Sequence, residues 1–131
     1  MVEEMTADVI SLKLPPMDMM YKVIRLTTAA VASRTGLTID QADDLNTALD
    51  ELSRLYNEGE TQGAADFHIE YYVYPDRLEV ITRGSGLSLE NEDAEISRYS
   101  RFILESVCDS YEDQSVRKDD QVIKLIKYIP R

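Results

Sequence analysis

The stretch Asp40-Gln-Ala-Asp-Asp-Leu-Asn-Thr-Ala-Leu-Asp-Glu-Leu-Ser-Arg-Leu55 predicts a long amphipathic helix. Its apolar residues recur at intervals of three and four, which places them along one stripe of a helix. The stripe consists of Ala42, Leu45, Ala48, Leu49, Leu52, Leu55 and the following Tyr56. Thr38-Ile-Asp-Gln41 has the pattern of a capping box, in which two side chains satisfy free backbone N–H groups. We therefore expect a continuous helix over Asp40–Tyr56 that packs on a core.

The residues before this helix predict a strand and a first helix. Asp8–Leu14 alternates apolar and polar residues, as a half-buried strand does. Pro15 and Pro16 end it, because proline has no N–H group to donate. The next apolar residues fall on one helical face, with Gly36 expected as the C-terminal cap. That face consists of Met20, Val23, Ile24, Thr27, Ala30 and Val31.

The second half of the chain predicts a hairpin, a third helix and closing strands. In residues 66–83, Phe67, Ile69, Tyr71 and Val73 share one strand face, and Pro75-Asp76 makes the turn. The third helix has an expected apolar face of Ile96, Tyr99, Phe102, Ile103, Val107 and Tyr111. Residues 112–120 can hold a short strand, and Gln121–Ile129 predicts the last one. This order predicts an α+β fold, a two-layer sandwich of helices on a mostly antiparallel sheet.

Composition narrows the class of protein. The 131 residues are expected to form one domain over 1–131, with 44% hydrophobic and 30% charged residues. No apolar run is long enough to span a bilayer, and the N-terminus lacks the features of a signal peptide, which predicts a cytoplasmic protein without membrane contact. A net charge of −11 argues against nucleic-acid binding. It is compatible with a basic protein partner, although solubility alone explains it.

Two segments resemble a known family. Ile24-Arg-Leu-Thr-Thr-Ala-Ala-Val-Ala-Ser-Arg-Thr-Gly36 and the helix after it are similar to the front half of the bacterial anti-sigma factor serine/threonine kinases, which belong to the histidine-kinase-like ATPase superfamily. The resemblance extends over nearly the whole chain and implies the helix-on-sheet fold of that superfamily. In the family, a helical Glu and an Asn four residues later hold Mg-ATP. Glu51 matches the Glu, but Leu55 replaces the Asn and offers no oxygen to Mg²⁺. Asn57 lies about 240° round the helix from Glu51 and faces elsewhere.

The other two nucleotide motifs of the family also differ here. Thr82-Arg-Gly-Ser-Gly86 resembles its Asp-x-Gly-x-Gly motif and keeps Gly84 and Gly86, but Thr82 replaces the Asp that binds the adenine amino group. The family has a glycine-rich lid before the third helix, whereas this chain has Ser97-Arg-Tyr-Ser-Arg101 and no glycine after Gly86. The side chains of Arg98 and Ser100 would block close backbone approach to phosphates.

The resemblance implies an anti-sigma-factor-like regulator that works by protein–protein binding, with lost or weakened ATP binding and no expected cofactor. Its partners would be a sigma factor, the antagonist protein, or a second copy in a homodimer. The alternative is an active ATP-dependent serine/threonine kinase that uses Mg-ATP and keeps Glu51 as its base. A third reading is an unrelated binding role on the same fold. His68, the only histidine, cannot form a histidine metal cluster, and Cys108 is expected to be a packed thiol.

Overall fold

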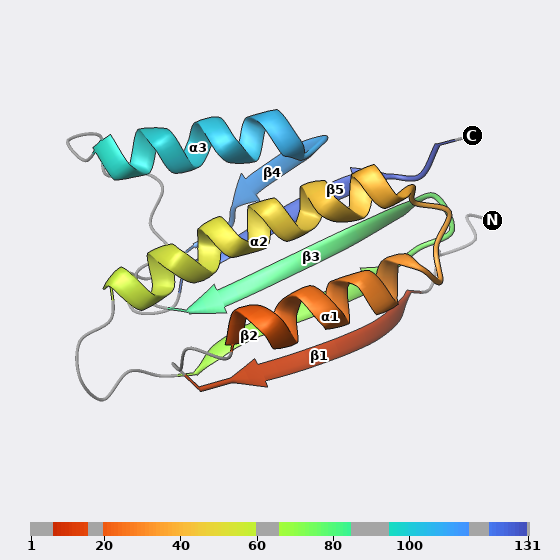
Figure 1. Cartoon of the computed structure of the whole chain (residues 1–131), viewed down its shortest axis with the longest axis horizontal. Coiled ribbons are helices and arrows are strands. Elements are labelled where there is room, and N and C mark those ends of the chain that lie inside the picture. Colours follow the sequence, from red (N-terminus) through yellow and green to blue (C-terminus); the bar gives the residue numbers. More distant parts are fainter. Residues whose placement is uncertain (1–6, 16–19, 60–65, 85–94, 116–120, 131) are drawn as a thin grey trace.

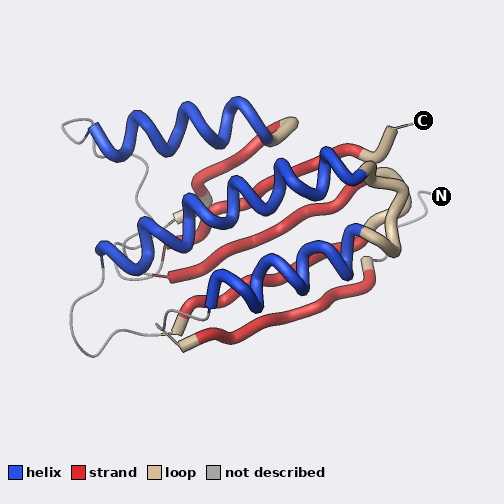
Figure 2. The backbone as a smooth tube through the Cα atoms, viewed as in Figure 1, coloured by secondary structure: helices blue, strands red, loops and turns tan. Residues whose placement is uncertain are grey.

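Five strands form one antiparallel sheet, and three helices cover one of its faces (Figures 1 and 2). The computed structural model describes residues 7–15, 20–59, 66–84, 95–115 and 121–130. The elements run in the order β1 (Asp8–Leu14), α1 (Met20–Ala32), α2 (Ile39–Gly59), β2 (Phe67–Val73), β3 (Arg77–Gly84), α3 (Glu95–Val107), β4 (Ser110–Asp113) and β5 (Gln121–Tyr128). This confirms the predicted α+β sandwich.

The sheet has the strand order β1-β2-β3-β5-β4, and all neighbouring strands are antiparallel. Along β2, Phe67, Ile69 and Tyr71 are buried beneath the helices, whereas His68 is exposed on the other face, as the alternation predicts. The central strand is β3, which pairs with β2 on one side and with β5 on the other. The edge strands are β1, next to β2, and the short strand β4, next to β5. The end of β3 and the start of β5 therefore lie side by side beneath the helix layer.

Helix α2 is the middle helix and supplies much of the core. Leu45, Leu49, Leu52 and Tyr56 are all 0% exposed, which confirms the predicted stripe. The helix is longer than Asp40–Tyr56 at both ends. Its start has the predicted capping box, since the Gln41 N–H donates to Thr38 Oγ1 at 3.1 Å and the Thr38 N–H donates to Gln41 Oε1 at 3.0 Å. None of the helices in the described ranges is both long and apolar enough to cross a membrane.

The predicted apolar face of α1 was partly wrong. Met20, Ile24 and Val31 are buried as expected, but Val23 is 37% exposed and Ala30 is exposed. Thr27 is only half-buried, and the helix instead buries Thr28 and Ala32. The Thr28 hydroxyl lies 2.7 Å from the Tyr71 hydroxyl across the core, and this bond satisfies a polar group that periodicity alone assigns to the surface. Burial raises the pKa of Tyr71 to about 12.

The prediction for α3 was wrong at two of its aromatic residues, Tyr99 and Phe102. Tyr99 is 60% exposed and Phe102 is 67% exposed, whereas Ser100 and Leu104 are buried. Helix α3 packs against α2 and β4, and Ser100 lies on the side of α3 that contacts α2. Tyr111 lies in β4 rather than in the helix, and the side chain of Ile96 is outside the described residues.

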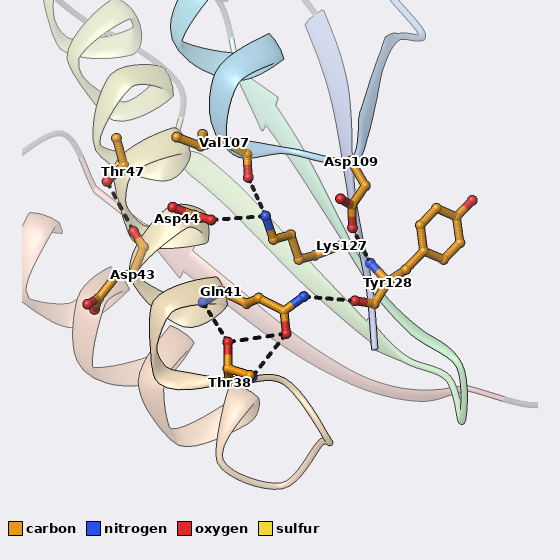
Figure 3. A network of polar contacts seen from close by, with 9 residues as sticks. All are labelled: Thr38, Gln41, Asp43, Asp44, Thr47, Val107, Asp109, Lys127 and Tyr128. Atoms are coloured by element: carbon orange, nitrogen blue, oxygen red, sulfur yellow. Dashed lines mark hydrogen bonds and ion pairs between the residues drawn. The ribbon is translucent and has the colours of Figure 1, made fainter. Parts of the chain in front are cut away.

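Polar contacts join the start of α2, the end of α3 and the end of β5 (Figure 3). The Lys127 ammonium donates to Asp44 Oδ2 at 3.0 Å and to the carbonyl of Val107 at 2.7 Å, while Gln41 Nε2 donates to the carbonyl of Tyr128 at 3.1 Å. A cation at the last carbonyls of a helix is favourable. Gly36 lies against Ile129, just beyond the end of β5, and a Cβ at Gly36 would be 2.6 Å from Ile129 Cγ2. Glycine is therefore required at position 36 by close packing and not by the predicted role as a helix C-terminal cap.

Candidate functional site

Glu51, the residue that matches the family's catalytic Glu, lies at the contact between α2 and α3. Its side chain is only 7% exposed. Ser100 Oγ of α3 donates a hydrogen bond to Glu51 Oε1 at 2.6 Å. The guanidinium of Arg54, one turn further along α2, forms an ion pair with the same carboxylate. A buried carboxylate needs such partners, because an uncompensated charge is costly away from water.

The position of the family's metal-binding Asn belongs to the hydrophobic core. Leu55 is 6% exposed and packs in the cluster that α2 forms with the sheet. The side chain of Asn57 lies outside the described residues. Within the described part of the chain, no group of three or more His, Cys, Asp or Glu residues could hold a metal ion. Leu55 therefore contributes packing at a position where Mg²⁺ would need an oxygen.

The hairpin motif is also buried. Thr82 is 0% exposed, and its hydroxyl donates to the carbonyl of Ile123 on β5 at 3.2 Å. Gly84 lies directly under the ring of Tyr56: a Cβ at Gly84 would be 2.8 Å from Tyr56 Cδ1 and 3.2 Å from Phe67 Cδ1. Gly86, the other glycine of the motif, lies outside the described residues. Glycine at position 84 permits a close approach, and the group that approaches is the Tyr56 ring of the protein itself.

Tyr56 is the residue of this site whose role the sequence did not reveal. It was predicted as a core residue of α2, and it is 0% exposed. Its ring stacks in a tilted arrangement on Phe67, with centroids 4.9 Å apart and planes at 37°. Aromatic pairs with this spacing add to the stabilisation from burial. The only sequence signal is that a large ring follows Leu55 directly at the end of the stripe.

A hollow of about 350 Å³ opens on the solvent side of the helix layer. It is lined by Tyr21, Arg25, Thr47, Asp50, Glu51, Arg54 and Ile103, so all three helices contribute to it. Arg25 Nε donates to Asp50 Oδ2 at 3.2 Å, and this hydrogen bond raises the pKa of Arg25. Both arginines of the hollow therefore face carboxylates that already pair with them.

The remaining predicted residues have ordinary environments. Arg98 and the aromatic residues Tyr99 and Phe102 lie on the exposed side of α3. Cys108 is buried, and desolvation by burial raises its pKa to about 12, which confirms the predicted packed thiol. The structure therefore brings Glu51 and Ser100 together. Thr82 and Gly84 lie in a separate environment, at the end of β3 beside the start of β5.

Several curated proteins are similar to this chain. The serine-protein kinase RsbW of Bacillus subtilis is 36% identical over 89 residues, which cover 64% of this chain and 54% of that protein. RsbW of Halalkalibacterium halodurans is 30% identical over 88 residues, covering 63% and 51%. RsbW of Listeria innocua is 29% identical over 143 residues, covering 93% and 88%.

No protein-family model matches the chain. The chain spans about half the length of the first two relatives, and nearly all of the third. The resemblance to the anti-sigma factor serine/threonine kinases is confirmed by these matches.

Proposed function

Because the chain is a relative of the anti-sigma factor serine/threonine kinases, we propose that it is a regulatory protein that acts by protein–protein binding, with lost or weakened ATP binding. Its partner would be a sigma factor, the antagonist of that sigma factor, or both, in the cytoplasm. Association of two copies is part of the proposal. No cofactor is needed for this activity, since a protein interface does not depend on a filled nucleotide pocket.

The observation that carries the proposal is the environment of Glu51. A general base must reach the proton that it removes through a hydrogen bond or one water. Both carboxylate oxygens of Glu51 instead accept hydrogen bonds from the protein, Oε1 from Ser100 and Oε2 from Arg54. These contacts favour a structural role for Glu51 as the joint between α2 and α3.

The other matched positions support the same conclusion. Mg²⁺ requires oxygen ligands, and Leu55 lies in the core without one. The hydroxyl of Thr82 already donates a hydrogen bond to the carbonyl of Ile123. The ring of Tyr56 occupies the space over Gly84 into which a ligand would otherwise approach. Each of these side chains contributes to packing that holds the helices on the sheet without a ligand.

The alternative is an ATP-dependent serine/threonine protein kinase. It is favoured by the relatives, which are serine-protein kinases, and by the retention of Glu51. Such an enzyme would have to hold Mg-ATP through unconventional ligands, because phosphoryl transfer depends on metal charge and on positioning. It would also have to release Glu51 from Ser100 and Arg54 before the carboxylate could act as a base.

Nucleotide binding is tested by thermal unfolding in Mg-ATP, with an RsbW relative as positive control. A ligand at about 100 times its dissociation constant stabilises the folded state by about 2.7 kcal/mol. For a domain of this size the melting temperature would rise by about 10 °C. We expect no saturable rise for this chain in millimolar Mg-ATP. The control variant is Thr82→Val, which keeps the shape of the side chain and removes its hydroxyl. A saturable rise in melting temperature that Thr82→Val abolishes would show that the chain has a nucleotide site.

Partner binding and catalysis are separated in a second experiment. The purified chain is mixed with the sigma factor and the antagonist encoded nearest to its own gene, with and without radiolabelled ATP. We expect a complex whose dissociation constant does not change with ATP, and no label on the antagonist. Label on an antagonist serine, absent with Glu51→Gln, would establish the kinase instead. If neither protein binds, the proposed regulatory role is wrong, and only the similarity in fold remains.

A further inference from the structure

The first strand of the sheet has one unpaired edge. Strand β1 pairs with β2, and no other strand in the described ranges pairs with its outer edge. Such an edge presents backbone N–H and C=O groups that another strand can bind. Val9, on the face away from the helices, is 48% exposed, and Ile10 and Leu12, on the helix face, are only half-buried. Strand β1 therefore presents apolar side chains on both faces of an open edge.

Helix α1 has an exposed stripe on the same side of the molecule. The opposite side of the helix faces α2, because the guanidinium of Arg25 donates to the carboxylate of Asp50 on α2. Residues about 100–180° round the helix from Arg25 face away from α2. We call them the α1 stripe, and they are Val23, Leu26, Thr27, Ala30 and Arg34. Leu26 is 64% exposed and is the largest apolar residue of the stripe.

The α1 stripe and the edge strand form one surface. A groove of about 390 Å³ is lined by Ile10 of β1 and by Leu26, Thr27, Ala30, Val31 and Arg34 of α1. Helix α1 also reaches β2, where the hydroxyls of Thr28 and Tyr71 lie 2.7 Å apart. The helix therefore lies above the pair β1 and β2, at the edge of the sheet (Figure 1).

This surface is complementary to a second copy of itself. Antiparallel pairing of two β1 strands about a two-fold axis at Ser11 pairs all seven residues of the strand. Ile10 then lies opposite Leu12 of the second copy, and the two half-buried side chains meet on the helix face. Residues directly opposite one another point to the same face of a sheet, so the helices of both copies lie on one side of the joined sheet.

The same axis brings the two α1 helices to packing distance. Neighbouring strands are about 4.8 Å apart, and helices pack with their axes about 8–10 Å apart. Because α1 lies above β1 and β2 in each copy, the two helices are separated by about two strand spacings, or about 10 Å. The two α1 stripes then face one another.

The charges on this surface permit the contact. Helix α1 contains no acidic residue, so it adds nothing to the repulsion between two chains of net charge −11. Arg34 lies eight residues beyond Leu26, and in two antiparallel helices that meet at Leu26 the arginines are about 24 Å apart. At physiological salt this distance is several times the screening length of about 8 Å.

We propose that two copies of the chain associate through β1 and α1, with the two-fold axis at Ser11 and with Leu26 of each copy at the centre of the helix contact. The inference rests on the association of two copies in the proposed function and assigns it an interface. The joined sheet runs through both copies and uses the only edge of β1 that β2 leaves unpaired in the described structure.

Sedimentation equilibrium over a micromolar concentration series measures the association. Leu26→Glu should weaken it about a hundredfold, because each dimer loses two leucine contacts. The matched control is Phe102→Glu, which adds the same charge at a 67% exposed aromatic residue of α3. We expect the control to dimerise like the unsubstituted chain. A monomeric unsubstituted chain, or an equal loss in both variants, would overturn the proposal.

Disulfide formation tests the register of the two strands. The experiment uses the Cys108→Ala background, so that the introduced thiol is the only one. Ser11→Cys should form a covalent dimer under mild oxidation, because opposite Cα atoms about 4.5–5.5 Å apart suit a disulfide. Val9→Cys alone should not, since the two copies of position 9 lie about 13 Å apart along the strands. Lys13→Cys alone should fail for the same reason.

Mixing Val9→Cys with Lys13→Cys should give a covalent heterodimer, because these positions lie opposite one another in the proposed register. All three cysteine positions are exposed on the face away from the helices, so the substitutions leave the core intact. Crosslinking of Val9→Cys alone, or no crosslinking of either Ser11→Cys or the mixture, would show that the register is wrong. A chain that dimerises in this register but binds neither a sigma factor nor an antagonist would refute the proposed regulatory role and leave this interface. A monomer that binds either protein would refute the interface alone.

Discussion

The substitution Gly84→Ala tests whether the glycine at the end of β3 serves packing. The added methyl would lie 2.8 Å from Tyr56 Cδ1 and 2.9 Å from Cε1, closer than ordinary carbon contacts. Overpacking of this kind typically costs about 1–3 kcal/mol. The backbone at Gly84 is not in the left-handed region, so alanine would otherwise gain about 0.4–1 kcal/mol by restricting the unfolded chain. We therefore expect a net loss of about 1–2 kcal/mol in the free energy of unfolding.

The assay is urea unfolding of the single variants and of the double variant with Tyr56→Ala. Removing the ring should cost about 3–5 kcal/mol by itself, because Tyr56 is fully buried. In that background the methyl of Gly84→Ala has space, and its cost should fall to about zero or become a small gain. If Gly84→Ala stabilises the unsubstituted protein, or costs the same with and without the Tyr56 ring, the packing explanation of Gly84 is wrong.

Three further predictions follow from buried groups. Leu52→Ala should lower the free energy of unfolding by about 2–5 kcal/mol in the same assay, because Leu52 is 0% exposed; a loss within about 0.5 kcal/mol would contradict its burial. Ser100→Ala should cost about 1.5–3 kcal/mol by removing a donor to the buried carboxylate of Glu51, whereas Ser106→Ala, on the exposed side of the same helix, should cost less than about 0.5 kcal/mol. Cys108 should resist thiol reagents at pH 8 unless urea is present. Because burial raises the pKa of Cys108 in the folded state to about 12, its contribution to the free energy of unfolding should be lost as the pH rises from about 8.5 toward 12. The Cys108→Ala variant should lose less stability over the same pH range.

The sequence predicted the elements whose patterns are local. The stripe of α2 and the alternation of β2 follow from burial on one face of a regular element, and both are confirmed at Leu52 and Ile69. The capping box at Thr38 needs only residues three positions apart, and it too is confirmed. These features depend on backbone geometry alone, so a single sequence contains enough information to find them.

The wrong predictions share a different physical cause. An apolar stripe shows that a helix can bury one face, but its neighbours decide which face is buried. Helix α3 contacts α2 and β4, and this arrangement leaves Tyr99 and Phe102 exposed. The bond between Ser100 and Glu51 joins positions 49 residues apart, and no local pattern marks it. The position of Tyr56 over Gly84 likewise depends on how α2 lies on the sheet.

The proposed loss of ATP binding has an energetic consequence for the helix layer. A protein that binds a nucleotide tightly gains stability from it, by about 4.1 kcal/mol at 1,000 times the dissociation constant. A chain without the nucleotide must hold the same helices with its own side chains. Leu55, the pair of Tyr56 with Phe67, and the bond from Ser100 to Glu51 all lie at or next to the matched motif positions, and all stabilise the contacts of α2. Restoring a metal ligand with Leu55→Asn should therefore destabilise the protein without creating a nucleotide site, because a polar amide would replace core packing while the ring of Tyr56 still covers Gly84.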